Sequence, residues 1–120
     1  MKIAITTSGQ GLDAPMDPRF GRAAGFVVVD PESGENETVD NAQNLNAQQG
    51  AGIQAAKTVS DLGVEAVITG NCGPKAYRAL QAAGVKVYLC SGGSVNEALE
   101  QYKAGTLELS SGANVEGHWV

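Results

Sequence analysis

The chain has few of the side chains from which catalytic and metal sites are usually built. Among its 120 residues there is one histidine, His118, which we interpret as incidental, and there are two cysteines, Cys72 and Cys90. The cysteines do not have the spacing of a zinc finger or a redox motif, so we expect free thiols. A phosphate-binding P-loop and a set of converging carboxylates are also missing. The sequence therefore predicts a protein that is not an enzyme.

Long apolar runs and an excess of positive charge are absent as well. No stretch approaches the length of a membrane span, and no signal peptide precedes the first strand. The formal net charge is −5, whereas binding to nucleic acid requires a basic surface. We therefore expect a cytoplasmic protein that has neither a nucleic acid nor a membrane as its partner.

Short apolar runs separated by glycine and proline make up most of the chain, and they predict a single α/β domain. The predicted strands cover residues 2–7, 26–29, 37–40, 66–68 and 85–89. The predicted helices cover residues 51–62, 74–83 and 95–104. In the first of these helices we expect Ile53, Ala56 and Val59 to be buried on one side.

The order of these elements predicts the topology. A hairpin followed by right-handed crossovers gives a mixed five-stranded sheet in the order 3-2-1-4-5, with strand two antiparallel and helices on both faces. We assign residues 1–110 to this domain and residues 111–120 to a polar, mobile tail.

In open α/β sheets a ligand binds beyond the carboxyl ends of the parallel strands, where the strand order reverses. Here that point lies between strands one and four. Four loops rich in glycine, serine, asparagine or glutamine leave the sheet at this end, namely residues 8–24, 41–49, 70–74 and 91–94. Two of them lead into helix N-termini, at Gly73-Pro74 and at Ser94, where unpaired N–H groups attract anions. The acidic hairpin turn, residues 30–35, is expected at the opposite end, so the loops predict an anion-binding site.

The segment 17–23 supplies positive charge at this end of the sheet. Arg19 and Arg22 flank a phenylalanine and a glycine. Arginine offers a planar, permanently charged group that suits anions, and glycine lets backbone N–H groups come close to them. The segment is therefore interpreted as an anion contact, and the alternative is that both arginines are simply solvated.

Two interpretations of the cysteines stay open. Cys90 is interpreted as a small buried apolar residue, as free cysteines commonly are. We expect Cys72 to be exposed near a helix N-terminus, where its pKa would fall and its thiolate could bind a soft metal. The alternative is an ordinary loop thiol. Because both residues follow adjacent strands, they could also approach each other.

Five further motifs stand in a distinctive order and spacing: Lys2-Ile3-Ala4-Ile5, Arg19-Phe20-Gly21-Arg22-Ala23, Gly50-Ala51-Gly52-Ile53, Gly73-Pro74, and Ser94-Val95-Asn96-Glu97 followed by Gly105. Together they resemble the dinitrogenase iron–molybdenum cofactor biosynthesis family, over nearly all of residues 1–110. The resemblance implies a ribonuclease-H-like sheet. It also implies a role in carrying or processing molybdenum- or iron-containing sulfide clusters.

The function that the resemblance implies is a non-enzymatic carrier for a molybdenum–copper sulfide cluster, or for a related molybdenum- or iron-sulfide cluster, held without covalent attachment. A partner protein of the same pathway is a further expectation. Some family members have histidines where this chain has Arg19 and, approximately, Gln48 or Gln49, which favours charge and N–H contacts over imidazole ligation. The candidate cluster-binding residues are Ser8, Gly9, Arg19, Phe20, Gly21, Arg22, Gln49, Gly50, Asn71, Cys72 and Gly73, and Cys72 is also the candidate metal ligand.

Two other functions stay open. A regulatory or scaffolding module would meet a partner protein through residues 41–49 and the polar tail. An enzyme would act on a nucleotide or on another phosphorylated small molecule.

Overall fold

The structure is a computed structural model, and it describes residues 2–41 and 51–110. The candidate residues Gln49 and Gly50 lie outside the described residues, as do residues 42–48 of the predicted loop 41–49, the predicted tail 111–120 and His118. None of the helices in the described part of the chain has the length and hydropathy that crossing a membrane would require.

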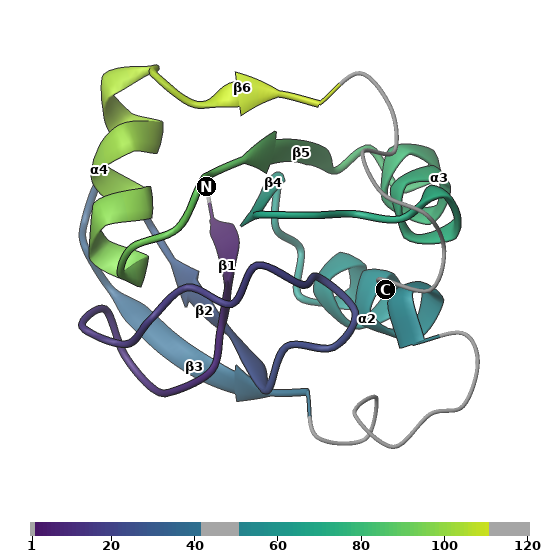
Figure 1. The fold of residues 1–120 in the computed structure, drawn as a ribbon, viewed down its shortest axis with the longest axis horizontal. Coiled ribbons are helices and arrows are strands. Elements are labelled where there is room, and N and C mark those ends of the chain that lie inside the picture. The colour runs from purple at the N-terminus through teal and green to yellow at the C-terminus, as the bar shows by residue number, and fades with distance from the viewer. Residues whose placement is uncertain (1, 42–50, 111–120) are drawn as a thin grey trace.

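One mixed sheet forms the centre of the molecule (Figure 1). Its strands, in spatial order, are β3 (Asn36–Asp40), β2 (Gly25–Val29), β1 (Ile3–Thr7), β4 (Ala66–Thr69), β5 (Lys86–Leu89) and β6 (Glu108–Leu109). Strands β1, β4 and β5 are parallel neighbours, whereas β2 is antiparallel to both β1 and β3. The predicted order of the first five strands and the antiparallel direction of strand two are confirmed.

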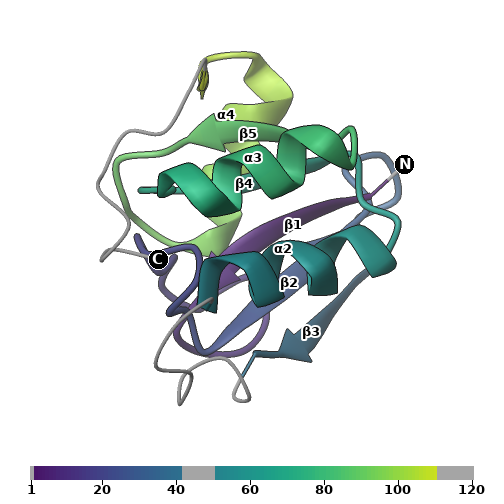
Figure 2. The same ribbon diagram turned by 90° about the vertical axis from the view of Figure 1, so that its right-hand side faces the viewer.

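Helices cover both faces of the sheet, as predicted. Helices α2 (Ala51–Asp61) and α3 (Pro74–Ala82) lie on one face, and α4 (Val95–Ala104) lies on the other (Figure 2). Every residue of β1, β2 and β4 is buried. Apart from the threonines Thr6, Thr7 and Thr69 at their carboxyl ends, these strands have no polar side chains, because both of their faces lie in a hydrophobic core.

Each face of the sheet has its own core cluster. On the α2 and α3 side, Phe20, Val67 and Leu80 are among the buried residues. On the α4 side, Ile5, Ile68 and Leu99 are among them. The alternation of side chains along β4 therefore sends Val67 and Ile68 into different clusters.

The prediction of five strands is wrong, because β6 adds a sixth. Leu109 pairs with Tyr88 of β5, and the Ser110 N–H donates to the Val87 carbonyl at 2.8 Å. This strand is only two residues long, and the side chain of Leu109 is 53% exposed. Backbone hydrogen bonds form β6 rather than apolar burial, so its sequence carries no strand pattern. The ribonuclease-H-like relationship implied by the resemblance stays a prediction.

The prediction that Ile53 is buried is also wrong, because its side chain is 45% exposed. The inward stripe of α2 begins at Gly52 and continues through Ala55, Ala56 and Val59, all of which are buried. These positions have the i, i+3, i+4, i+7 spacing of one helix face. Ile53 lies one position outside this stripe, and its size alone does not turn it inward.

Candidate functional site

The long loop 8–24 crosses the carboxyl ends of the parallel strands and contacts the other loops there. Isolated bridges join Thr7 to Met16, Pro15 to Ser94, and Arg19 to Asn71. The loop therefore meets both the segment after β4 and the segment before α4. The predicted meeting of loops 8–24, 70–74 and 91–94 is confirmed.

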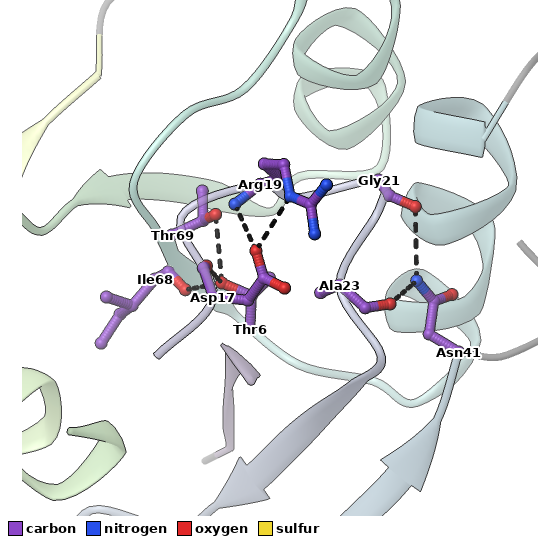
Figure 3. A network of polar contacts seen from close by, with 8 residues as sticks. All are labelled: Thr6, Asp17, Arg19, Gly21, Ala23, Asn41, Ile68 and Thr69. Carbon is purple, nitrogen blue, oxygen red and sulfur yellow. Dashed lines mark hydrogen bonds and ion pairs between the residues drawn. The ribbon is translucent and has the colours of Figure 1, made fainter. Parts of the chain in front are cut away.

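The hydroxyl of Thr6 fixes this loop to the sheet. Thr6 lies in β1 and is fully buried, and its Oγ1 donates to the carbonyl of Asp17 (Figure 3). The Asp17 N–H in turn donates to the Thr6 carbonyl at 2.9 Å. Thr6 Oγ1 also lies 3.1 Å from Oγ1 of Thr69, at the end of β4. One buried side chain thus connects β1, β4 and the start of the arginine segment.

A close backbone approach holds the next residues of the loop against the segment after β4. A Cβ atom at Gly70 would lie 2.9 Å from the Cα of Pro18, so only glycine fits without a shift of the loop. The Phe20 N–H donates to the Asn71 carbonyl at 3.2 Å. Arg19 is therefore placed beside the segment that leads into α3.

Arg19 is half exposed, but it is paired with a carboxylate. Oδ1 of Asp17 accepts from the Arg19 backbone N–H at 2.9 Å and lies 3.4 Å from Arg19 Nε (Figure 3). The side chain of Asp17 is 6% exposed and that of Arg19 is 49% exposed. Arg19 is therefore a cation facing solvent, with part of its charge offset by Asp17, and its role as an anion contact stays a prediction.

The rest of the arginine segment is tied to the core. Phe20 is fully buried, and its ring centroid lies 5.9 Å from that of Phe26. The side-chain amide of Asn41 donates to the carbonyls of Gly21, at 3.4 Å, and of Ala23, at 2.8 Å. Arg22 is partly buried. Phe20 and Gly21 thus shape the loop from inside, while Arg19 is its exposed cation.

Asn41 is a residue of this site that the sequence reasoning missed. It is 2% exposed and directly follows β3. In the sequence it opens a stretch rich in asparagine and glutamine, so it was indistinguishable from the loop that follows. Its position at the end of a predicted strand could have identified it, because backbone carbonyls of a neighbouring loop often need a side-chain donor there.

The structure places Ser8 and Gly9 in a different setting from Arg19. Together with Gln10, Ala24, Gly25, Thr38 and Asp40, they line an open cavity of about 380 Å³. The Gly11 N–H donates to Oγ1 of Thr38 at 3.0 Å, which holds this part of the loop over the end of β3. The predicted site residues that the structure describes therefore form two groups, one over β3 and one over β4.

The two helix N-termini at this end differ, and the prediction for α4 is wrong. The N–H groups of Val95 and Asn96 donate to the carbonyls of Ala14 and Leu12, at 2.9 and 2.8 Å. Ser94 and Glu97 complete a capping box. The first turn of α4 therefore has no N–H left for an anion, because the loop and the cap use all of them.

Helix α3 starts without such partners. Its N-cap is Gly73, which has no side chain to cap it, and its first residue, Pro74, has no N–H. Among the described residues, no acceptor is recorded for the N–H groups of Lys75 and Ala76. The positive end of the α3 dipole thus faces the same end of the sheet as Arg19.

The prediction that Cys72 is exposed with a lowered pKa is wrong. Its side chain is fully buried in the core cluster beneath α2 and α3. Burial raises the pKa of the Cys72 thiol from its ordinary value of 9.0 to about 12. Cys90 belongs to the cluster on the other face of the sheet, so the two thiols do not form a pair. The assignment of Cys72 as a metal ligand stays a prediction.

Across residues 2–41 and 51–110, no three or more histidine, cysteine, aspartate or glutamate side chains are grouped so as to hold a metal ion. What this end of the sheet offers an anionic ligand therefore includes the exposed guanidinium of Arg19 and the open start of α3. Contacts of this kind recognise a charged group from outside and do not coordinate a metal.

Comparisons with known proteins give a consistent result. The family model for the dinitrogenase iron–molybdenum cofactor matches residues 1–105. An uncharacterized protein of Methanocaldococcus jannaschii is 34% identical over 110 residues, which is 90% of each chain. The apo form of the orange protein from Desulfovibrio gigas is 45% identical, with a TM-score of 0.92 over 95% of this chain and 96% of that one. A putative NifB protein from Thermotoga is 37% identical, with a TM-score of 0.83 over 97% and 98%.

Replacing Thr6 with valine tests the anchor of the loop. The change keeps the shape of the side chain but removes the buried donor to Asp17 and the contact with Thr69, so we expect a loss of about 1–3 kcal/mol in the free energy of unfolding. The measurement is urea unfolding followed by circular dichroism. Thr58→Val is the matched control, because its hydroxyl donates to the carbonyl of Gln54 one helical turn away and so lies within a single helix. An equal, small loss in both variants would contradict the anchoring role.

The buried thiol of Cys72 makes the stability depend on alkaline pH. Between pH 9 and about 12 the unfolded chain loses the thiol proton while the native chain keeps it. The unfolded state then binds fewer protons, so the free energy of unfolding falls as the pH rises through this range. We expect a shallower fall in Cys72→Ala, measured by urea unfolding at pH 8, 9 and 10. If the free energy of unfolding falls equally with pH in the two proteins, the native state does not keep the thiol of Cys72 protonated in this range.

Proposed function

The chain belongs to the dinitrogenase iron–molybdenum cofactor family, and from this premise we propose that it is a carrier, without catalytic activity, for an anionic metal–sulfide cluster. The proposed place of binding is the surface of the arginine segment at the carboxyl ends of β1 and β4. The first candidate cargo is a molybdenum–copper sulfide cluster, and the second is a related iron–molybdenum sulfide cluster.

The observation that carries this proposal is the placement of Arg19. Its guanidinium is half exposed, while its backbone bridges to Asn71, two residues before the N-cap of α3. A cation and a helix start without a side-chain cap are thus held next to each other by the hydrogen-bonded loop. Each charge-assisted hydrogen bond to an anion contributes about 1.5–3 kcal/mol, so a few of them suffice to retain a preassembled cluster.

The donor set supports retention by charge and N–H groups rather than by metal–protein bonds. Ligation by Cys72 would first require a thiol with a pKa of about 12 to lose its proton in an apolar environment. A sulfide cluster whose metals are already bound to sulfide needs no further ligand. Its outer sulfur atoms carry negative charge and accept hydrogen bonds. A second candidate function, a scaffolding module, depends on residues 41–49 and 111–120, almost all of which lie outside the described residues.

Reconstitution of the apo protein tests the proposal. Mixing it with tetrathiomolybdate and a copper(I) salt, followed by desalting, should give a visible chromophore that elutes with the folded protein. Metal analysis of the same fractions should find molybdenum and copper in a constant ratio to protein. The control is the same protein unfolded in urea before mixing, which should stay colourless. A native protein that also elutes colourless would rule out the carrier function.

Arginine variants test the electrostatic basis of binding. We expect Arg19→Ala, alone and combined with Arg22→Ala, to lower cluster affinity by about tenfold or more, because each removes a charge-assisted contact. The salt dependence of retention should also become less steep than in the wild type. Lys86→Ala is the matched control, since it removes one positive charge at the amino end of β5. If the double variant retains the cluster as well as the wild type and has an unchanged melting temperature, the two arginines do not hold the cluster.

A further inference from the structure

Asp17 is a carboxylate where the proposed function calls for positive charge. Its side chain is 6% exposed and lies beside the guanidinium of Arg19, which is the exposed cation assigned to the anion. A negative charge at this distance weakens the attraction of any anionic ligand. We therefore expect Asp17 to make a contribution to binding that offsets its repulsion of the ligand.

The backbone of Asp17 is held more firmly than that of an ordinary loop residue. Its N–H and its carbonyl both bond to Thr6, which is itself tied to Thr69 at the end of β4. The next residue is Pro18, whose fixed φ angle and close packing on Gly70 restrict the path of the chain. The carboxylate thus has a defined position relative to the sheet.

This fixed carboxylate contacts Arg19 at two points. Oδ1 accepts from the backbone N–H at 2.9 Å and faces Nε at 3.4 Å. Among the described residues, the two terminal nitrogens of the same guanidinium have no hydrogen-bond partner, and in Figure 3 no dashed line reaches them. The contact therefore uses the inner edge of the guanidinium and leaves its outer edge for another acceptor.

We propose, on the basis of the proposed function, that Asp17 is the positioning residue for Arg19. The chain of contacts runs from Thr69 through Thr6 and Asp17 to the guanidinium, and it presents the two terminal nitrogens toward a cluster sulfide or another anion. A free arginine side chain loses rotational freedom when it binds, and this loss reduces affinity. Asp17 removes part of that loss in advance, which offsets its own repulsion of the ligand.

A double-mutant cycle tests the proposal with the cluster formed from tetrathiomolybdate and copper(I) as the probe. We expect Asp17→Ala to lower cluster affinity about tenfold in the wild-type background. In the Arg19→Ala background the same change should have less than about a twofold effect, because Asp17 acts through Arg19. Asp17→Asn keeps an acceptor for both Arg19 groups and removes the negative charge. It should therefore bind the cluster within about threefold of the wild type.

The outcomes that overturn the proposal are distinct. Tighter binding by both Asp17 variants would make the carboxylate a simple counterion that opposes the ligand. An equal loss of affinity with and without Arg19 would make it a residue that only holds the loop. Lys86→Ala is again the charge control, and melting temperatures identify variants that fail to fold.

A measurement on the apo protein separates this proposal from the carrier function. In ¹⁵N-labelled protein the Nε–H group of Arg19 should give a resonance with slow solvent exchange and restricted motion. Asp17→Ala should remove both properties, and Asp17→Asn should restore most of them. If the wild type shows this signature but never retains the chromophore, the carrier function fails while the positioning of Arg19 stands. If the Arg19 resonance is equally mobile in all three proteins, the positioning role fails regardless of cluster binding.

Discussion

The hydroxyl of Thr6 is the contact on which the geometry of this end of the molecule depends. It lies where β1 and β4 run in parallel, and it must find a partner because it is fully buried. Its partners are the carbonyl of Asp17 and the hydroxyl of Thr69. The long loop is therefore anchored at the position where the sheet offers the least freedom. The arginine segment takes its orientation from a strand end and not from its own sequence.

Most of the fold could be predicted from the sequence because its central elements satisfy local and global requirements together. Strands β1, β2 and β4 are mostly apolar and buried on both faces, so their pattern and their environment agree. The capping box at Ser94 and the left-handed Gly105 mark both ends of α4. The predictions for β6 and Ile53 failed because in each case the local sequence pattern and the burial do not agree. β6 buries almost nothing, and Ile53 is a large apolar residue displaced by one position from a stripe of small ones.

The site could be predicted only in outline, because its chemistry depends on which polar groups already have hydrogen-bond partners within the protein. The sequence locates two helix starts, but it does not show that the carbonyls of Ala14 and Leu12 occupy the N–H groups of α4. It places Cys72 after a strand and before a helix, a position that is exposed in many proteins. Here the residue lies under α2 and α3, and desolvation raises its pKa instead of lowering it. Burial and pairing are properties of the assembled loops, and no short motif encodes them.

The proposed binding of an anion to an acidic protein requires charges that act locally. The acidic turn between β2 and β3 lies at the pole opposite the arginine segment, in a molecule 35 Å along its longest axis. Exposed charges are screened beyond about 8 Å at physiological ionic strength, so the net charge of −5 has little influence at the far end of the sheet. Arg19, Asp17 and the start of α3 are among the groups that set the local balance of charge there. Asp17 faces the inner edge of the Arg19 guanidinium, so it lies farther from an incoming anion than the guanidinium does. Its repulsion of the anion is therefore weaker than the attraction by Arg19. An anion approaching from solvent therefore meets the positive edge first.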